Sequence, residues 1–461
     1  MLDSLTLIFP RLKYRTGDPP LGICYIAGHL KNIYPELNIK ILDSTFHNSF
    51  KTIRNHVRNN KPQAIGIYVD TVMYNPAKKL LKELRKNVPL IIAGGPHATI
   101  SPQSLFEVAD IVVKGEAEQT MADLIRELPE GSLKDISGIY FKNNGRVFQT
   151  SGEIKRPALD ELEIPALGLL DNIEHYIRYW HYLDPLSPKY KGLNVMASRG
   201  CIFNCSYCQP TLKKLFGENL RYKSPQYLIT ELKYYIKNFK VNNFFFHDDT
   251  LTTNKRWMDE FCTLILENNL NIKWGCNSRI DTVDREMLEI MHRAGLRVIH
   301  YGIESGSQRI LDEVYNKGIQ LENAAKIINL TRNTGIHPSG FFMIGAPTES
   351  VKEMFKTIIL SWKLKLAEAS FSLTTPFIGT HLYEKIKNNS NYKIANNFSE
   401  FDYYCKVSLH NKNTLNFIPS LLQKIGIITF YSSCLRWKYI FKHLISFRGI
   451  RKLVNKIARF I

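Results

Sequence analysis

The chain has 461 residues, 44% of them hydrophobic, and a formal net charge of +19. This length and apolar content indicate a globular chain with room for two or three domains. The eight cysteines form no even, closely paired framework, which excludes a secreted disulfide scaffold and favours a reducing compartment. Residues 1–10 lack a basic leader and a long apolar core, so we expect a first strand, no signal peptide and a cytoplasmic protein.

Residues 1–128 alternate between short apolar runs and helical patterns. Continuous apolar strands that alternate with helices indicate a parallel sheet covered on both faces. We therefore expect an α/β, doubly wound domain, which binds ligands beyond the carboxyl ends of its strands. The expected strands are 5–9, 39–43, 64–70, 90–95 and 111–115, and the expected helices are about 20–33 and 75–86.

The loops after these strands carry glycines and polar side chains. Paired glycines let a bulky ligand approach the backbone closely, although a glycine after a buried strand is more often simple turn chemistry. The candidate ligand contacts in these loops are Gly94, Gly95, His97, Gly115 and Glu116. Residues 136–150 alternate across Asn144-Gly145, which predicts a hairpin at the edge of this first domain, placed at 1–150. Prolines in residues 151–192 indicate a linker.

Residues 193–389 repeat the alternation at intervals suited to a βα barrel. Six units fit a partial barrel of TIM type better than a closed eight, and chemistry in such barrels lies at the carboxyl ends of the strands. The side chains or glycines expected at those ends are Asp248, Asp249, Ser278, Arg279, Glu304 and Gly345. The expected strands are 193–197, 242–247, 273–277, 297–303, 340–344 and 369–374, separated by helices at 225–239, 255–268, 284–294, 322–334 and 351–366.

Three thiols, Cys201, Cys205 and Cys208, follow the first of these strands and can converge on one metal centre. A structural zinc site needs four protein ligands, and His247 could serve as the fourth. A cubane iron–sulfur cluster has four irons that each need an outside ligand, so three cysteines leave one iron open. The remaining cysteines are each isolated in sequence.

The cysteine spacing, with the aromatic Tyr207 just before the last thiol, is similar to the signature of the radical S-adenosylmethionine (SAM) enzymes. In that family the open iron chelates the amino and carboxylate groups of SAM. The resemblance implies that Asp248 accepts bonds from the SAM ammonium group, that Ser278 and Arg279 face its carboxylate, and that Glu304 holds ribose hydroxyls. Gly345 lies in what looks like the adenine-contacting strand. Tyr207, beside Cys208, is expected to contact the cluster or adenine, and the alternative for it is core packing. The alternative for each polar residue is a helix cap or an ion pair.

The strand-end loops of residues 1–128, placed before this motif, resemble the cobalamin-binding domain of the B12-dependent radical SAM family. Many such domains supply a histidine to cobalt through Asp-x-His-x-x-Gly, but here Asp43 is followed by Thr45, and His47 lies two residues too far along. The resemblance therefore implies cobalamin held without a lower histidine, with His97 lining the pocket for the nucleotide tail. The alternatives are that His97 is a ligand or that the domain has lost cobalamin.

The resemblance implies a radical SAM enzyme with a 4Fe–4S cluster, SAM and cobalamin that methylates an unactivated carbon. The cluster would reduce SAM to a 5'-deoxyadenosyl radical that abstracts a substrate hydrogen, and methylcobalamin would deliver the methyl group. An electron donor such as flavodoxin or ferredoxin is expected. The alternatives are a cobalamin-containing radical SAM enzyme doing cyclisation, ring contraction or oxidation, and a non-catalytic zinc-stabilised protein that binds nucleic acid or membrane.

The last segment, residues 390–461, is expected to be a basic, α-helical region. After Asp402 no acidic residue occurs, while eleven lysines and arginines do, which is more than half of the excess charge. Residues 417–435 are interrupted by Gln423 and Lys424, so we expect no spanning helix there. Aromatic and basic residues then interleave as in an interfacial amphipathic helix, or as a lid on the barrel. We expect a small-molecule or lipid substrate, possible peripheral contact with the inner face of the membrane, and no nucleic-acid partner.

Overall fold

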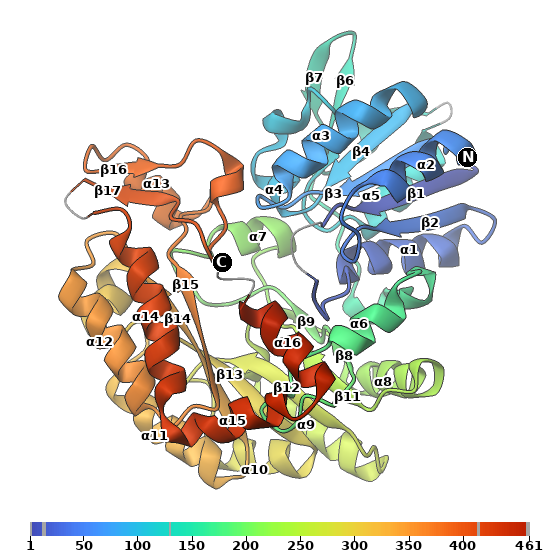
Figure 1. Cartoon of the computed structure of the whole chain (residues 1–461). Helices are drawn as coiled ribbons and strands as arrows, with labels where there is room; N and C mark the ends of the chain where they lie inside the picture. Colours follow the sequence, from blue (N-terminus) through green and yellow to red (C-terminus); the bar gives the residue numbers. More distant parts are fainter. Residues whose placement is uncertain (1, 12–14, 129–130, 413–414, 458–461) are drawn as a thin grey trace. The chain divides into compact units, whose positions relative to one another are not determined.

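A computed structural model of the chain describes residues 2–11, 15–128, 131–412 and 415–457. The chain divides into two compact units. The first unit contains the residues up to Tyr176 together with Thr211–Arg221, and the second contains Ile177–Pro210 and the residues from Tyr222 onward (Figure 1).

The first unit is built on a seven-stranded sheet in the order β2-β1-β3-β4-β5-β6-β7. The first five strands of that order are mutually parallel, and β6 and β7 continue the sheet in antiparallel pairing. This confirms the doubly wound domain, in which the strand order reverses between β1 and β3, the place where sheets of this class bind ligands. The strands are β1 (Ser4–Phe9), β2 (Asn38–Asp43), β3 (Ala64–Tyr68), β4 (Leu90–Gly94), β5 (Ile111–Val113), β6 (Ile139–Asn143) and β7 (Arg146–Gln149).

Helices cover this sheet because each carries an apolar stripe. The expected helices at 20–33 and 75–86 are confirmed, but helices that were not expected lie at Lys51–Asn60, Pro96–Ile100, Glu118–Glu127 and Thr211–Phe216. The first of these was missed because it buries only Ile53 and Val57 in an otherwise polar stretch. The helices of this unit are α1 (Leu21–Ile33), α2 (Lys51–Asn60), α3 (Tyr74–Leu84), α4 (Pro96–Ile100), α5 (Glu118–Glu127) and α7 (Thr211–Phe216).

The predicted hairpin is confirmed at the sheet edge, where β6 and β7 meet across Asn144 and Gly145. Both residues have positive φ, 47° and 76°, as the tight turn between twisted strands requires. Helix α6 (Ile173–Tyr179) lies across the border between the two units. The border thus falls inside the segment expected as a linker, and α7, expected in the second domain, belongs to the first unit.

The second unit contains a six-stranded parallel sheet in the order β15-β14-β13-β12-β11-β8. Its strands follow one another along the chain without a reversal, which confirms the partial barrel of six units. All six expected strands are present, as β8 (Leu193–Val195), β11 (Asn243–Phe246), β12 (Lys273–Ser278), β13 (Leu296–Glu304), β14 (His337–Ile344) and β15 (Glu368–Leu373).

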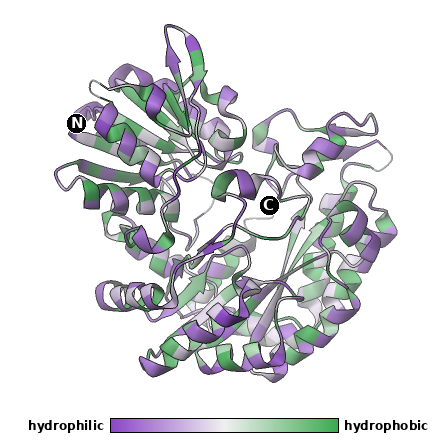
Figure 2. Cartoon of the chain, turned by 180° about the vertical axis from the view of Figure 1, so that it is seen from behind, coloured by the Kyte–Doolittle hydropathy of each residue, from purple (hydrophilic) through white to green (hydrophobic). Residues whose placement is uncertain are grey.

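The barrel helices lie where the apolar periodicity predicts them, and local capping explains their starts. Side chains of Ser224, Asn254, Asp284 and Ser350 accept backbone N–H groups of the first turns of four of them. Along the helices of this unit, hydrophobic and hydrophilic residues alternate (Figure 2). The helices are α8 (Pro225–Phe239), α9 (Lys255–Glu267), α10 (Arg285–Arg293), α11 (Glu322–Asn333) and α12 (Val351–Lys363).

The basic C-terminal segment is helical, as expected, after a small antiparallel pair that was not anticipated. Helix α14 packs against α12 and β15 of the barrel, and α15 packs against α16. Among the described residues, no helix is long and apolar enough to cross a membrane. The remaining elements are the two-residue pair β9 (Ser198–Arg199) and β10 (Arg221–Tyr222), α13 (His381–Ile386), β16 (Tyr392–Ile394), β17 (Leu409–Asn411), α14 (Ile418–Ser432), α15 (Cys434–Leu444) and α16 (Phe447–Ile457).

Candidate active site

The three motif cysteines lie in one loop that follows β8 and β9 in the barrel unit. Cys205 is buried, whereas Cys201 and Cys208 keep part of their surface exposed, and all three are free thiols. The loop begins at Gly200, whose φ of +99° is a conformation that side-chain-bearing residues rarely adopt. The turn therefore depends on a glycine directly before the first thiol.

Backbone hydrogen bonds hold this loop without using the thiols. The Ser206 N–H donates to the Tyr315 carbonyl at 2.8 Å. The side-chain amide of Gln209 donates to the carbonyls of Cys201 at 3.3 Å and Phe203 at 3.1 Å. Groups other than the thiols therefore hold the loop in this shape.

The donor set fits a cubane cluster. Within the described part of the chain, no three His, Cys, Asp or Glu side chains are grouped as they would be around one metal ion. In a cubane each thiolate binds a different iron, so the three ligands need not meet at one point. Burial, and then the charge of Asp249, raises the pKa of Cys208 well above its usual value. Bound iron would supply the positive charge that a buried thiolate needs.

The two aspartates after β11 differ in their surroundings. The Asp248 carboxylate is buried and accepts the N–H groups of Ala197, at 3.2 Å, and Ser198. Asp248 therefore fixes the strand end that leads into the cysteine loop. Asp249 is exposed to solvent, yet crowding by protein atoms, and then the charge of Asp248, raises its pKa to about 7. A carboxyl group that is both crowded and reachable by solvent is suited to binding a ligand.

Ser278 and Arg279 stand at the end of β12, and both are buried. The Ser278 hydroxyl shares a 2.7 Å hydrogen bond with the Thr252 hydroxyl, so it is held within the fold. The Arg279 guanidinium donates to both carboxylate oxygens of Asp281, at 2.9 and 2.7 Å, while its Nη1 lies 3.7 Å from Cys205 Sγ. Arg279 thus places a fixed positive charge beside the cysteine loop.

Tyr207, Glu304 and Lys317 form a triangle of hydrogen bonds. Lys317 Nζ donates to Glu304 Oε1 at 2.8 Å and to the Tyr207 hydroxyl at 3.0 Å, and that hydroxyl donates to Glu304 Oε1 at 3.2 Å. A Cβ at Gly302 would lie 2.6 Å from Glu304 Oε1, so the glycine makes room for the triangle. Glu304 itself has a φ of +67° at the end of β13. The expected site residues Tyr207 and Glu304 are therefore in contact.

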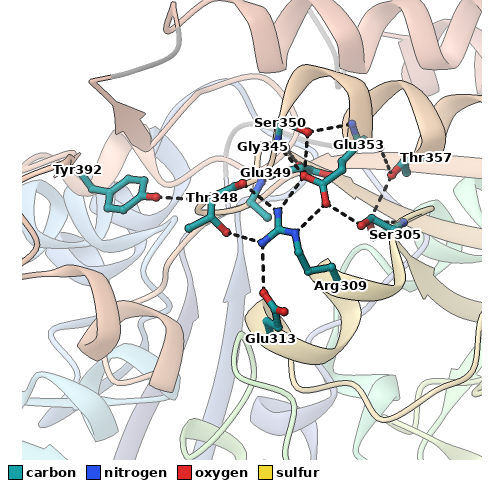
Figure 3. A network of polar contacts seen from close by, with 12 residues as sticks. Ser305, Arg309, Glu313, Gly345, Thr348, Glu349, Ser350, Glu353, Thr357 and Tyr392 are labelled. Atoms are coloured by element: carbon teal, nitrogen blue, oxygen red, sulfur yellow. Dashed lines mark hydrogen bonds and ion pairs between the residues drawn. The ribbon is translucent and has the colours of Figure 1, made fainter.

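A second polar network fixes the ends of β13 and β14 (Figure 3). The Arg309 guanidinium donates to both carboxylate oxygens of Glu353, at 3.0 and 2.8 Å, and to the Thr348 carbonyl at 3.0 Å. Glu353 also accepts the Ser350 N–H at 3.0 Å, and Ser350 caps α12 in return. These side chains couple the loop after β13 to the loop after β14.

Gly345 and Glu349 lie in the same loop after β14. Gly345 has a φ of +85°, and a Cβ there would lie 2.9 Å from Pro419 Cβ. Glu349 Oε2 accepts the N–H groups of Gly345 at 2.8 Å and Ala346 at 2.9 Å, while its Oε1 has no hydrogen-bond partner among the described groups. Burial raises the pKa of Glu349 to about 7. Here the glycine meets α14 of the same unit.

In the first unit, most of the candidate ligand-binding residues after β4 contact other groups of the same unit. The two ring nitrogens of His97 lie 3.1 Å from the Thr71 hydroxyl and 3.0 Å from the Ser104 hydroxyl, and burial lowers the pKa of His97 to about 4. Gly95 adopts a φ of +105°, and a Cβ there would lie 2.9 Å from a β3-end carbonyl. A Cβ at Gly94 would lie 3.9 Å from Val113 Cβ, an ordinary van der Waals contact, so this glycine is not required by a close approach.

Gly115 and Glu116 bind a neighbouring segment of their own unit. The buried Glu116 carboxylate pairs with Arg221 and lies 3.6 Å from Arg156 Nε. A Cβ at Gly115 would lie 3.1 Å from the Leu215 carbonyl in α7. These contacts hold α7 and its following turn against the end of β5, and ligand contact by either residue stays a prediction.

The place of the Asp-x-His-x-x-Gly motif is filled by a hydroxyl network. Asp43 Oδ1 accepts the N–H and the hydroxyl of Thr45, at 2.9 and 2.7 Å. The Tyr176 hydroxyl donates to Asp43 Oδ2 and lies 2.9 Å from Thr45 Oγ1. These residues fit a cobalamin held with no imidazole from this loop, because Thr45 stands where the motif has histidine and its hydroxyl is bonded to Asp43.

Two residues near the cysteines were missed or underweighted in the sequence. Lys317 gave no signal because it lies in a loop 13 residues after Glu304, its partner. Asp249 was visible as half of an Asp-Asp pair, but only the fold separates its solvent-exposed carboxyl group from the buried one of Asp248. Glu349 lies four residues after Gly345, and no role was expected for it from the sequence.

Comparison with known proteins identifies both units. Residues 195–360 match the Radical SAM superfamily, and residues 13–125 match the B12 binding domain. An uncharacterized methyltransferase of Pyrococcus horikoshii is 32% identical over 461 residues, which cover 96% of this chain and 94% of that protein. Cytidylyl-2-hydroxyethylphosphonate methyltransferase of Streptomyces wedmorensis is 27% identical over 63% of this chain and 59% of its own length.

Solved structures agree on the fold. The radical SAM methyltransferase TsrM of Kitasatospora setae, with cobalamin and a 4Fe–4S cluster bound, superimposes with a TM-score of 0.71 at 15% identity, covering 85% of this chain and 77% of that one. The chain therefore belongs to the cobalamin-dependent radical SAM enzymes, whose cofactors are a 4Fe–4S cluster, SAM and cobalamin.

Proposed function

We propose that this enzyme transfers a methyl group to an unactivated carbon of a small molecule. The observation that carries the proposal is the hydrogen-bonded loop of Cys201, Cys205 and Cys208 in a chain that also has a B12-binding unit. The name of the 32% identical relative, which is matched over nearly its whole length, supports methyl transfer. In this proposal the cluster supplies an electron, SAM supplies both the hydrogen-abstracting group and methyl, and cobalamin carries the methyl.

The chain's own residues would bind and orient these groups. We assign the three thiolates to the cluster and Arg279, fixed 3.7 Å from Cys205, to the negative charge gathered there. Asp249 is suited to accept hydrogen bonds from an ammonium group, because its carboxyl group is reachable by solvent. Asp248, expected in that role, would act indirectly, by fixing the strand end.

The triangle of Tyr207, Glu304 and Lys317 would face the nucleoside. Glu304 Oε1 already accepts two bonds, from Lys317 and Tyr207, so Oε2 is the atom we assign to ribose hydroxyls. Gly94, Gly95, His97, Gly115 and Glu116 would shape the cobalamin crevice mainly through backbone, since His97 and Glu116 are bound within their unit.

Anaerobic reconstitution with a strong reductant tests the proposal. We expect about four irons and four sulfides per chain. We also expect one molecule of 5'-deoxyadenosine and one of S-adenosylhomocysteine to form from SAM for each molecule of methylated product. Formation of 5'-deoxyadenosine without methyl transfer would reject methylation while leaving the radical SAM assignment intact.

The proposed electron donor of the enzyme is a flavodoxin or a ferredoxin. The proposed location of the enzyme is the cytoplasm.

A second candidate function is ring closure. Anaerobic magnesium-protoporphyrin IX monomethyl ester cyclase of Cereibacter sphaeroides is 25% identical over 83% of this chain, covering 64% of its own length. The two candidates predict different fates of SAM, because a cyclase leaves no methyl on its product. The absence of S-adenosylhomocysteine beside a cyclised product would favour this second function.

A further inference from the structure

Helices α15 and α16 have the reverse of the usual arrangement of polar and apolar side chains. Their buried face carries polar side chains: Arg436, His443 and Lys452 are 2%, 0% and 4% exposed. Lys452 Nζ donates to Asp184 Oδ1 at 2.6 Å, and His443 Nε2 lies 3.4 Å from Asp184 Oδ2. Arg436 donates to the Leu364 carbonyl at 2.7 Å. Polar contacts therefore anchor these helices to the barrel unit.

The outward face of the same helices is apolar. In α15 the exposed side chains recur at intervals of three, four and seven to eight residues, which places them on one stripe. In α16 the intervals of three and four repeat, and the side chain of Phe447 is 86% exposed. The stripe consists of Trp437, Phe441, Leu444, Ile445, Phe447, Ile450 and Val454.

Folding of the barrel does not account for this stripe. A surface helix normally turns its apolar side inward, because each large apolar side chain removed from water stabilises the fold by about 1.5–3 kcal/mol. Single exposed apolar residues are common, but a contiguous set on successive turns marks an interaction surface. The stripe is thus available to a second apolar phase or partner.

Charge around the stripe selects the occupant. Lys442 and Arg451 are exposed on these two helices, and no acidic residue occurs after Asp402. A second copy of the chain would bring the same cations face to face, which is unfavourable in an isologous interface. An anionic lipid surface offers the opposite charge, and a tryptophan is well suited to the boundary between headgroups and acyl chains.

A cationic hollow next to α15 gives a second, independent indication. It has a volume of about 350 Å³, and its lining includes Arg332, Lys365 and Lys442. Arg332 and Lys365 belong to α11 and to the loop after α12, far from α15 in sequence. The fold therefore brings cations from three elements together in one hollow, which α15 lines with Lys442 and where a phosphate headgroup could bind.

We propose that α15 and α16 dock this enzyme on an anionic membrane surface, with the stripe inserted at the level of the headgroups and the flanking cations on lipid phosphates. The helices would lie in the plane of the surface. Docking would bring the barrel unit to the membrane whatever reaction it performs, so the proposal does not depend on methyl transfer.

Flotation of the whole, iron-loaded enzyme with liposomes tests this proposal. Vesicles of phosphatidylcholine alone are compared with vesicles containing about one-third phosphatidylglycerol. We expect co-flotation with the anionic vesicles that weakens as salt rises, because the Debye length shortens to about 3 Å at 1 M. Failure of the wild-type enzyme to bind anionic vesicles would overturn the proposal.

Paired variants separate the two components of binding. Phe441→Ser with Ile445→Ser should lower partitioning more than about tenfold, since two apolar side chains no longer insert. Lys442→Glu should lower partitioning on anionic vesicles by at least about fivefold, the contribution of one cation near a charged surface. The matched control is Tyr234→Ser with Leu266→Ser, two exposed apolar positions on α8 and α9.

The control variant should float as the wild type does. An equal loss of vesicle binding in the control and in the α15 variant would overturn the proposal, because non-specific hydrophobic adsorption would then explain the binding. Light scattering supplies the other arm: a wild-type dimer that becomes monomeric in the Phe441→Ser, Ile445→Ser variant would assign the stripe to a second copy instead. Retained iron content and SAM cleavage in that variant show that it has folded.

Discussion

The two units carry candidate side chains at the same place in the sheet, the carboxyl ends of parallel strands, but treat them differently. In the first unit, His97, Glu116 and Asp43 are engaged by groups of their own unit. In the barrel unit, Cys201 and Asp249 retain solvent-accessible surface. The comparison teaches that position at a strand end creates the opportunity for ligand contact, and that the surrounding hydrogen bonds determine whether a side chain is available.

The difference has a chemical reason. A barrel that holds a metal cluster and a charged nucleoside needs side-chain ligands, so some thiol and carboxyl groups must stay available. A cofactor bound by shape needs backbone room, and polar side chains near it can be used to stabilise the crevice. Changes in the barrel loop should therefore affect chemistry, and changes in the first unit mainly stability.

The largest effect is expected from the cysteines. Replacing Cys201, Cys205 or Cys208 with Ala should abolish SAM cleavage, because one iron loses its protein ligand and the cluster is not retained. Iron content and 5'-deoxyadenosine formation under reducing conditions measure this. Cys434→Ala is the matched control, since this thiol is exposed and distant in sequence from the loop, and it should keep both.

Two buried ion pairs compare the units directly. Lys317→Met removes the cation that pairs with Glu304, and Arg221→Met removes the main partner of Glu116; each should cost about 3 kcal/mol. Hydrogen exchange should show the lost protection in the unit that carries each change. Only Lys317→Met should also weaken SAM binding, and weakening of equal size by Arg221→Met would contradict the division between the units.

The pH dependence of stability should carry a contribution from Glu349. Burial raises its pKa from 4.5 to about 7, so the folded state favours the protonated form. The resulting stability is fully present below about pH 4.5 and is lost as the pH rises through about 7, an amount of about 3 kcal/mol. Urea unfolding at about pH 5 and pH 8 measures the loss.

Glu349→Gln should remove this contribution, because glutamine does not titrate and its oxygen can still accept the N–H groups of Gly345 and Ala346. The difference in stability between wild type and variant should therefore change with pH in the stated direction. A constant difference across that range would show that Glu349 is already ionised in the folded protein.

The smallest effect is expected at His97. His97→Asn should cost about 1–2 kcal/mol through its two hydroxyl contacts and leave the electron paramagnetic resonance spectrum of bound Co(II) cobalamin unchanged. Nitrogen splitting in the wild type that disappears in the variant would instead make His97 the lower ligand and reverse the comparison between the units.

The elements that could be predicted were those with strong local periodicity. Buried parallel strands such as β4 and β5 are uninterrupted apolar runs, and helices such as α8 start at a capping serine followed by proline. Helix α2 was missed because only Ile53 and Val57 face the core. The position of α7 could not be predicted, because the pairing of Glu116 with Arg221 joins residues 105 positions apart.

By itself, the sequence determined the two domain classes and the three-thiol loop, because apolar periodicity and cysteine spacing are local properties of the chain. Only the tertiary structure decided which polar residues remain available, placing Lys317 against Glu304 and Asp248 against the backbone at Ser198. It also decided that the C-terminal helices turn Arg436 and Lys452 inward and Phe441 outward. Such choices depend on partners far away in sequence, whose contacts exist only once the chain has folded.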